Sequence, residues 1–278
     1  MPVKLITDSG CDLPKSVTIR YDIEVIPLKV FVDEVEYLDS ESIESHQMML
    51  AIDKGVEVKT GQITPNTYEA VFNRYLDQGY DVLYLSFSSD LSSSYQSACL
   101  AKKNLEGKGR VEVLDTRCAS LGQGLLVLDA AKSLKHIDSI DALVDYVKSR
   151  IGDVNHHYVV SDLKYLFKGG RLSSTQYQVG KLIKMNLILG LEDGKLLLKD
   201  KKRGKKKSYQ KLLSNLSGKD LSNVTVGINY GLNTDDAEYI RSEVEALKPK
   251  EIIMHPIGCA IGAHTGPDYV GLFFQEKS

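Results

Sequence analysis

Short apolar runs alternate with helix-like patterns over the first half of the chain. Three of the runs are continuous and predict buried strands, at residues 3–7, 81–87 and 110–114. Three longer stretches carry apolar side chains at helical spacing, at residues 67–78, 95–105 and 121–134. Strands that alternate with helices through short links form parallel sheets covered by helices, so this half is predicted to be such a sheet. A separate hairpin is predicted over residues 23–37, with Asp33 and Glu34 in its turn.

The second half shows a different pattern, which predicts a mixed sheet. A predicted helix over residues 138–151 ends before Val154 and Asn155, which we take as a domain boundary. A hairpin turn is predicted at residues 192–195. Other strands are predicted at residues 158–160, 224–229, 251–255 and 271–274, and a helix at 234–247. The predicted fold class is therefore α/β, with a parallel-sheet N-terminal domain over residues 1–155 and a mixed-sheet C-terminal domain over residues 156–278.

Polar turns follow the predicted strands of the first half. They are residues 7–10, the serine-rich stretch 86–98, and residues 115–117. Ligands of such sheets bind beyond the carboxyl ends of the strands, so we expect these turns to converge, with Thr60 near the same edge. Ser92 and Ser93 precede a predicted helix, whose free N–H groups would attract an anion. Serines also favour helix caps for purely structural reasons, and the sequence leaves both interpretations open.

Two glycine-containing motifs in the second half carry further candidates. Residues 257–267 hold three glycines around His264, which could donate a hydrogen bond to a ligand or act as a base. The alternative is a histidine satisfied inside the core. Gly169 and Gly170 precede Arg171, which could bind an anion, although a helix cap followed by a surface arginine explains the glycines equally well.

Composition and charge restrict the classes of function. With 278 residues, 26% charged residues and a net charge of −2, the protein as a whole is not expected to bind polyanions. A basic run at residues 199–211 lacks interleaved aromatics. It is predicted to be a solvated face, with a docking patch for an acidic partner as the next interpretation and nucleic-acid binding the weakest.

Location and metal content are predicted from what the sequence lacks. No apolar run approaches the ~18 residues that suggest a membrane span, and the N-terminus has no signal-like segment, so we expect a cytoplasmic protein. The four cysteines, at positions 11, 99, 118 and 259, lie far apart, and no zinc site, disulfide framework or other metal site is predicted.

Five motifs together resemble the DegV family of fatty-acid-binding proteins over essentially the full length. Thr-Asp-Ser matches residues 7–9, and Thr-Ser-Gln-Pro matches residues 60–63, with Gly61 and Ile63 as departures. Leu-Ser-Gly-Thr-Tyr-Gln-Ser-Ala matches residues 91–98, with Ser93 and Ser94 in place of Gly and Thr. Lys-Gly-Gly-Arg-Ile-Ser matches residues 168–173. Ile-Gly-x-x-Ile-Gly-x-His-x-Gly-Pro-Gly matches residues 257–268, with Asp268 in place of the last glycine.

The resemblance implies a lipid-binding subunit with no catalytic residues and no cofactor. One long-chain fatty acid, such as palmitate, stearate or oleate, would lie buried between the domains. Its carboxylate would be held by Thr60, Ser92 and His264, and Ser93 could add a hydroxyl. In Gram-positive bacteria such a subunit presents the acid to a separate fatty acid kinase, which makes an acyl phosphate for phospholipid synthesis. Arg171 and Arg203 would contact the kinase or the phosphate.

Several functions compete with this prediction. A serine hydrolase acting on acyl esters would use Ser92, His264 and either Asp8 or Asp115, but no Gly-x-Ser-x-Gly elbow surrounds these serines. A kinase on its own lacks a phosphate-binding glycine loop. Burial of an acyl tail instead needs only an apolar slot, which the run at residues 182–191 could line.

Overall fold

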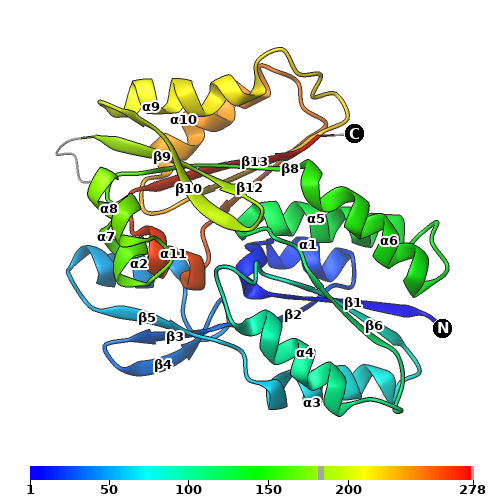
Figure 1. The fold of residues 1–278 in the computed structure, drawn as a ribbon. Helices are drawn as coiled ribbons and strands as arrows, with labels where there is room; N and C mark the ends of the chain where they lie inside the picture. Colours follow the sequence, from blue (N-terminus) through cyan, green and yellow to red (C-terminus); the bar gives the residue numbers. More distant parts are fainter. Residues whose placement is uncertain (181–184, 277–278) are drawn as a thin grey trace.

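Three sheets organise the molecule, shown in the computed structural model of Figure 1. The structure describes residues 1–180 and 185–276. The four-stranded and three-stranded sheets come from the first part of the chain, and the six-stranded sheet comes from residue 154 onward. The α/β fold with a parallel sheet followed by a mixed sheet is the predicted class, and it is confirmed. The domain boundary at residue 155 stays a prediction, and it falls inside a strand.

The four-stranded sheet is entirely parallel, in the order β2-β1-β6-β7. Its strands are β1 (Val3–Asp8), β2 (Glu24–Ile26), β6 (Asp81–Ser86) and β7 (Val111–Asp115). Every residue of β6 is buried, as expected for a central strand with helices on both faces. The three apolar runs that the sequence pattern assigned to strands are β1, β6 and β7, so that prediction is confirmed.

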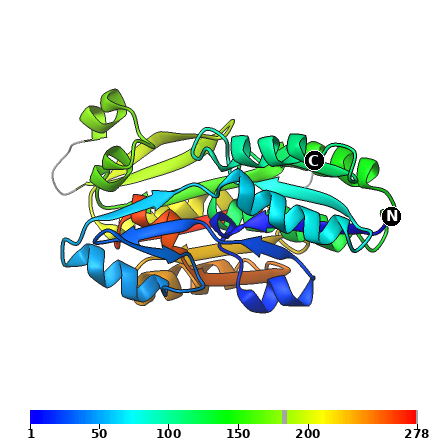
Figure 2. The ribbon, with the colours of Figure 1, turned by 90° about the horizontal axis from the view of Figure 1, so that it is seen from below.

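The three-stranded sheet is antiparallel, in the order β4-β3-β5, and it carries Thr60, one of the candidate site residues. Its strands are β3 (Lys29–Val32), β4 (Val35–Leu38) and β5 (Val58–Gly61). The predicted hairpin is correct for β3 and β4 but wrong before them, because β2 pairs with β1 in the parallel sheet. β5, which carries Thr60, was not predicted as a strand. This sheet lies at the opposite end of the molecule from both chain termini (Figures 1 and 2).

The six-stranded sheet is mixed, in the order β10-β9-β8-β13-β11-β12. Only β11 and β12 run parallel to each other. Its strands are β8 (Val154–Val160), β9 (Asn186–Glu192), β10 (Lys195–Lys202), β11 (Thr225–Tyr230), β12 (Glu251–Pro256) and β13 (Tyr269–Gln275). The predicted hairpin at residues 192–195 joins β9 to β10. β10 extends into the basic run, so Lys199 to Lys202 belong to a strand.

Helices cover and separate the two larger sheets (Figure 1). In chain order they are α1 (Lys15–Arg20), α2 (Ser45–Asp53), α3 (Pro65–Leu76), α4 (Ser94–Asn104), α5 (Ser120–Ser133), α6 (Ile140–Arg150), α7 (Lys164–Lys168), α8 (Ser174–Gly180), α9 (Lys205–Leu213), α10 (Thr234–Glu245) and α11 (Cys259–Thr265), with short 3-10 turns at Ser9–Cys11, Ile151–Asp153 and Ser214–Leu216. α3 and α4 cover the outside of the parallel sheet, and α9 and α10 cover the outside of the mixed sheet.

α5 lies between the two sheets and joins the halves of the molecule. It contacts β8, β11 and β13 of the mixed sheet, and most of its residues are buried. Its apolar side chains therefore belong to a hydrophobic core that both halves share. The space that remains between the halves beside this helix contains the candidate site.

Candidate functional site

A cavity of about 280 Å³ lies between the two halves. Its wall is mostly apolar and comes from both halves, including Leu91, Val160, Leu166, Leu189, Leu191 and Leu196. The predicted contribution of the apolar run 182–191 is thus correct for Leu189 and Leu191, whereas residues 182–184 lie outside the described residues. Thr60, Ser92, Ser93, Arg171 and His264 line the same cavity, so the fold brings together five of the six predicted site residues.

The polar wall of this cavity also faces a second cavity. Thr60, Arg171 and His264 line both the apolar cavity and a neighbouring one of about 650 Å³. Lys164 and Lys168 on α7 line only the second. The polar side chains therefore stand where an apolar slot meets a more polar, lysine-bearing space.

Thr60 and His264 form a direct pair across the two halves. Thr60 Oγ1 on β5 lies 2.8 Å from His264 Nε2 on α11. The other ring nitrogen, Nδ1, is buried and has no hydrogen-bond partner. Burial, together with the nearby charge of Arg171, lowers the pKa of His264 to about 3, so the ring is neutral at pH 7. An unpartnered buried polar atom of this kind is costly unless something bonds to it.

The serine turn supplies hydroxyls at the N-terminus of α4. Ser92 Oγ lies 3.0 Å from Ser94 Oγ and accepts a hydrogen bond from the Ser94 N–H group at 3.2 Å. Ser93 occupies the N-cap position but makes no side-chain cap bond. Ser92 therefore contacts the first turn of the helix, as the structural interpretation predicted, and it also lines the cavity. Its binding of an anion stays a prediction.

Arg171 carries a charge that no described carboxylate neutralises. Its Nε donates to the Leu91 carbonyl at 2.9 Å, and Nη1 donates to the Gly169 carbonyl. Among the ion pairs of the described residues none involves Arg171. Burial alone lowers the pKa of its guanidinium, because a desolvated cation is penalised when no anion faces it.

The two glycines before Arg171 have separate roles. Gly170 has a φ of +74°, which suits the second residue after α7, where glycine commonly ends a helix. Gly169 has ordinary φ but lies against His264, and a Cβ there would come within 2.0 Å of Nδ1. Close approach, rather than conformational freedom, therefore requires a glycine at position 169, and that approach fixes one face of the imidazole.

Two buried carboxyls that the sequence did not single out hold α11 in place. Asp39 accepts hydrogen bonds from the N–H groups of Cys259 (2.8 Å) and Ala260 (3.2 Å), and Asp12 accepts one from Gly258 at 2.9 Å. They satisfy orphan donors at the start of the helix that carries His264. No local signal marks them, because an acidic residue in a turn is common and its partners lie more than 200 positions away.

The polar turns after the parallel strands meet as predicted. Asp8, the last residue of β1, accepts a hydrogen bond at 2.9 Å from the N–H group of Phe87, which follows β6. Ser89 Oγ donates to the carboxylate of Asp115, the last residue of β7, at 2.6 Å. The carboxyl ends of the strands therefore form one polar edge.

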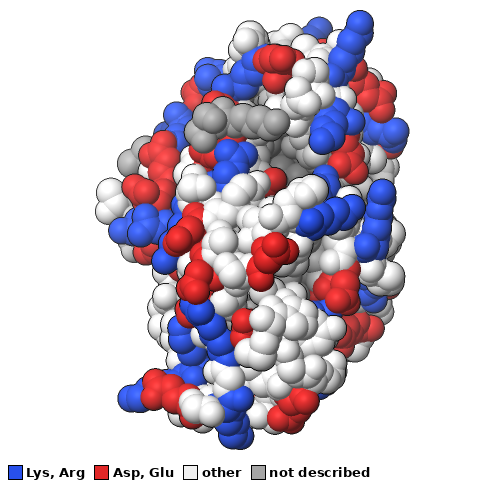
Figure 3. All heavy atoms as spheres, turned by 90° about the vertical axis from the view of Figure 1, so that its right-hand side faces the viewer, with Lys and Arg blue, Asp and Glu red and all other residues white. Residues whose placement is uncertain are grey.

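Arg203 lies apart from the other predicted site residues. It is exposed between β10 and α9 and does not line either cavity. On the face drawn in Figure 3, basic and acidic side chains are interspersed rather than segregated. Its predicted contact with a partner stays a prediction.

The hydrolase triad is not assembled. His264 contacts Thr60 rather than Ser92, and its Nδ1 faces no carboxylate. Asp115 instead accepts from Ser89. The geometry gives this alternative no support, because a triad needs nucleophile, base and acid in hydrogen-bond contact.

Residues 1–180 and 185–276 hold neither a metal-binding cluster nor a membrane-spanning helix. In that part of the chain no group of three or more His, Cys, Asp or Glu side chains is placed to hold a metal ion. None of the helices described there has the length and apolar character needed to cross a bilayer.

Known proteins match the chain from end to end. A family model described as "Uncharacterised protein, DegV family" matches residues 2–277. A DegV domain-containing protein of Clostridium acetobutylicum is 34% identical over 276 residues, which is 99% of each chain. A structure described as fatty acid binding of a DegV family protein from Thermus thermophilus is 30% identical, with a TM-score of 0.91 and full coverage of both chains. A stearic acid-binding protein from Eubacterium ventriosum is 25% identical, with a TM-score of 0.89 over 100% of this chain and 99% of that one. The chain belongs to the DegV family.

Proposed function

We propose that this protein binds one long-chain fatty acid, with the tail in the apolar cavity and the carboxylate at Thr60, Ser92, Ser93 and His264. One observation carries the proposal. The apolar cavity has a polar wall where a buried imidazole nitrogen lacks a partner and a half-buried arginine lacks an anion. A carboxylate would satisfy both groups at once. The fatty-acid-binding structures from Thermus thermophilus and Eubacterium ventriosum support the same ligand class.

The energetics favour an acyl chain over a small acid. Burial of each methylene contributes about 0.8 kcal/mol. A sixteen-carbon tail therefore contributes on the order of 10 kcal/mol before the costs of ordering and association. The head group adds orientation, because only a few donors stand in an otherwise apolar wall.

The bound acid is further proposed to be presented to a separate fatty acid kinase subunit in the cytoplasm, which would convert it to an acyl phosphate. Thr60, Arg171 and His264 line both the apolar cavity and the second, lysine-bearing cavity, which offers a phosphoryl donor a way to the proposed head-group position. Arg171 and the exposed Arg203 are the proposed contacts to the kinase or the phosphate.

Lipid identification tests the binding proposal directly. Native mass spectrometry and solvent extraction of the purified protein are expected to show a co-purified fatty acid. Its chain should have about sixteen to eighteen carbons, a length that suits an enclosed apolar cavity of this kind. Delipidated protein should rebind palmitate, stearate or oleate. Empty protein that also fails to bind all three added acids would contradict the proposal.

A matched pair of histidine variants tests the head-group assignment. His264→Ala is expected to weaken oleate binding by roughly tenfold or more, the effect of one lost charge-assisted hydrogen bond. His136→Ala changes an exposed histidine outside both cavities and serves as the control. Equal affinity of the two variants would remove His264 from the site.

A further inference from the structure

The β9–β10 hairpin leaves the six-stranded sheet before it reaches its turn. β9 pairs with β8 from Leu187 to Gly190, whereas its pairing with β10 continues as far as Glu192 and Lys195. β10 is the edge strand of the sheet. Among the described strands, the tip of the hairpin, residues 191–196, therefore pairs only with itself.

Two features at the base of the tip allow it to bend as a unit. The register between β9 and β10 shifts between Leu198 and Asp200, which places a β-bulge at Lys199. On β9, the last residue that pairs with β8 is Gly190, which has no side chain to pack. A bulge disrupts the ladder locally and glycine restricts the backbone least, so the hairpin can bend at this point.

The tip covers the apolar cavity from the side of the mixed sheet. Leu191 and Leu196 lie opposite each other in the hairpin, and both line the cavity. Phe87 and Leu91, which line the same cavity, belong to the serine-rich stretch of the other half. The tip therefore closes the space between the two halves over the apolar surface where an acyl tail would lie.

A buried hydrogen bond ties the tip to the N-terminal half. Ser88 Oγ donates to the Gly194 carbonyl at 2.8 Å, and both residues are buried although Gly194 lies in the turn of a hairpin. A Cβ at position 194 would come within 2.7 Å of Ser88 Oγ, so the turn packs directly on the serine-rich stretch. Ser88 is held in place by its own N–H group, which donates to the Cys118 carbonyl at 3.0 Å.

Two other polar contacts of the tip hold it less firmly against the N-terminal half. Arg117 and Asp193 form an ion pair at 3.6 Å, but both side chains are more than half exposed, and such pairs contribute little. Gln176 on α8 donates to the Leu196 carbonyl at 3.2 Å, but it belongs to the same half as the hairpin. Closure of the tip therefore depends mainly on the Ser88 hydroxyl.

We propose that the tip of the β9–β10 hairpin is a flap over the fatty-acid cavity, and that its opening at the Ser88–Gly194 bond sets the rate at which the acid enters and leaves. Segments that are held by few contacts open at a low cost in free energy, which suits a flap. Ser88 lines neither cavity and is in this sense a positioning residue. This inference rests on the proposed fatty-acid binding.

A flap makes a kinetic prediction that a purely structural contact does not. Ser88 does not touch the ligand, so weakening its bond to Gly194 raises the open fraction of the free and of the loaded protein by the same factor. The rate constants of association and release then rise together, and their ratio, Kd, is unchanged. Damage to the cavity wall would instead speed release alone and raise Kd.

Stopped-flow kinetics of the delipidated full chain with cis-parinarate, a fluorescent fatty acid, tests the proposal. Ser88→Ala should raise both rate constants about fivefold, the effect of one lost hydrogen bond of ordinary strength, and leave Kd the same within about twofold. Ser89→Ala is the matched control in the same loop, because its hydroxyl donates to Asp115 and not to the hairpin. It should keep the wild-type rates.

A reversible crosslink tests the opposite direction. A Cβ at position 194 would lie 3.4 Å from the Cβ of Arg117, close to the separation that a disulfide bridges, so Arg117→Cys with Gly194→Cys can lock the tip. The oxidised protein should take up and release cis-parinarate about tenfold more slowly, or slower still, than the same protein after reduction, because the open state is then inaccessible. Comparing two redox forms of one protein removes the effect of the substitutions on the turn, and Arg117→Cys alone is the control for the oxidant.

The outcomes distinguish the two proposals. If the delipidated wild-type protein binds neither cis-parinarate nor oleate, the proposed function fails and the flap fails with it. If the wild type binds but Ser88→Ala keeps the wild-type rates, or speeds release alone, only the flap proposal is overturned. Equal exchange by the oxidised and reduced forms of the crosslinked protein also overturns it, because the acid would then pass by another route.

Discussion

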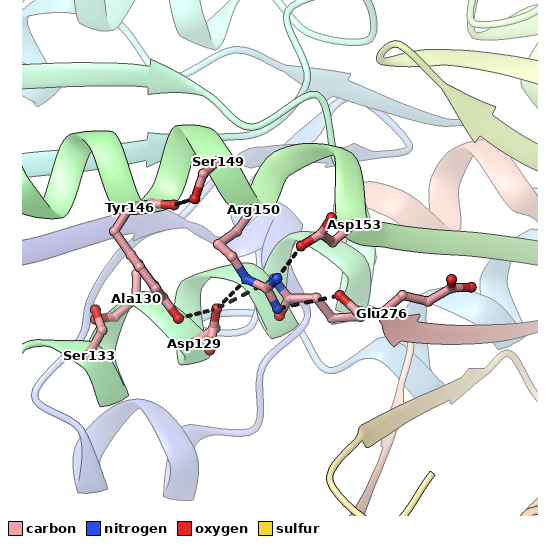
Figure 4. Close-up of polar contacts among 9 residues, drawn as sticks. Asp129, Ala130, Ser133, Tyr146, Ser149, Arg150, Asp153 and Glu276 are labelled. Atoms are coloured by element: carbon pink, nitrogen blue, oxygen red, sulfur yellow. Dashed lines mark hydrogen bonds and ion pairs between the residues drawn. The ribbon is translucent and has the colours of Figure 1, made fainter. Parts of the chain in front are cut away.

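Two arginines of this molecule, Arg150 and Arg171, differ in whether nearby carboxylates neutralise their charge. Arg150 on α6 lies between Asp129 on α5 and Asp153 in the following turn, and its guanidinium also approaches the Glu276 carbonyl (Figure 4). The Tyr146 hydroxyl adds a bond to Asp129 at 2.9 Å. Arg171 bonds only to carbonyl groups and faces no described carboxylate.

The comparison distinguishes two kinds of polar group. Some are neutralised by other residues of the chain, whereas others lack such partners and are expected to bind a ligand. Around Arg150 the charges are compensated by side chains of the chain itself, which ties α5, α6 and the end of β13 together. Around Arg171 and His264 the fold leaves a charge and a polar nitrogen without partners next to an apolar cavity. Incomplete compensation at a buried site is a physical reason to expect a ligand there.

The largest effect is expected from breaking the compensated cluster. Arg150→Met would leave Asp129 and Asp153 without their cation, and the free energy of unfolding should fall by about 3 kcal/mol because an unpaired, poorly solvated carboxylate is costly. Arg171→Met should change it by no more than about 1 kcal/mol, since two carbonyl bonds are lost but an uncompensated cation is removed. Urea denaturation of ligand-free protein measures both.

When oleate affinity is measured instead of stability, Arg171→Met should show the larger loss and Arg150→Met the smaller one. Arg171→Met removes a cation beside the carboxylate, whereas Arg150→Met acts far from the cavity wall. A loss of stability in Arg171→Met equal to that in Arg150→Met would show that Arg171 is structurally paired, and the distinction would fail.

A smaller effect is expected from Gly169→Ala. Its Cβ would come within 2.0 Å of His264 Nδ1 and 2.6 Å of Cε1, so the imidazole must leave the position in which Nε2 contacts Thr60. Oleate affinity should fall by roughly tenfold, comparable to the loss of one good hydrogen bond to a charged group. Gly152→Ala is the matched control, because a Cβ there meets nothing within 4 Å. Calorimetric titration of both proteins decides, and unchanged binding in Gly169→Ala would show that the ring tolerates displacement.

The smallest effect concerns pH. Unfolded histidine takes up a proton near pH 6.5, whereas folded His264 stays neutral down to about pH 3. The unfolded state therefore binds more protons over this window, and the contribution of His264 to stability is lost as pH falls. On going from pH 7.5 to 5.5, ligand-free wild type should lose about 1 kcal/mol more than His264→Gln.

Bound oleate should reduce this difference, because a carboxylate beside the ring favours its protonated form. The comparison with His264→Gln is needed because burial also lowers the pKa of His156, and raises the pKa of Asp8, Asp12 and Asp39, so other groups contribute to the total pH dependence. Parallel pH curves for the two proteins would contradict the assignment.

The helices and strands show which parts of the fold can be predicted from the local sequence pattern. β1, β6 and α5 were predictable because continuous apolar runs and helical spacing encode burial directly. β5 was missed because its residues, Val58 to Gly61, are too few and too polar to show alternation. α11 was hidden by the glycines in and around it, which disfavour a helix prediction.

The residues of the candidate site likewise fall into two groups, those that local motifs identified and those that they did not. Thr60, Ser92, Ser93, Arg171 and His264 were identified through local motifs, whose order along the chain is a property of the sequence. The carboxyls Asp12 and Asp39, which bind the N–H groups at the start of α11, were not identified in this way. Their partners are supplied by distant elements, so no local window contains the information.

The sequence by itself determined the alternation of strands and helices, the polar edge after the parallel strands, and the residue types available for an anionic head group. Only the tertiary structure decided which of these groups are compensated. That outcome depends on how the elements pack: Arg150 lies beside two carboxylates, whereas Arg171 and His264 line a cavity between the two halves. Burial makes the difference matter, because a polar group without a partner costs little in water and several kcal/mol inside a protein.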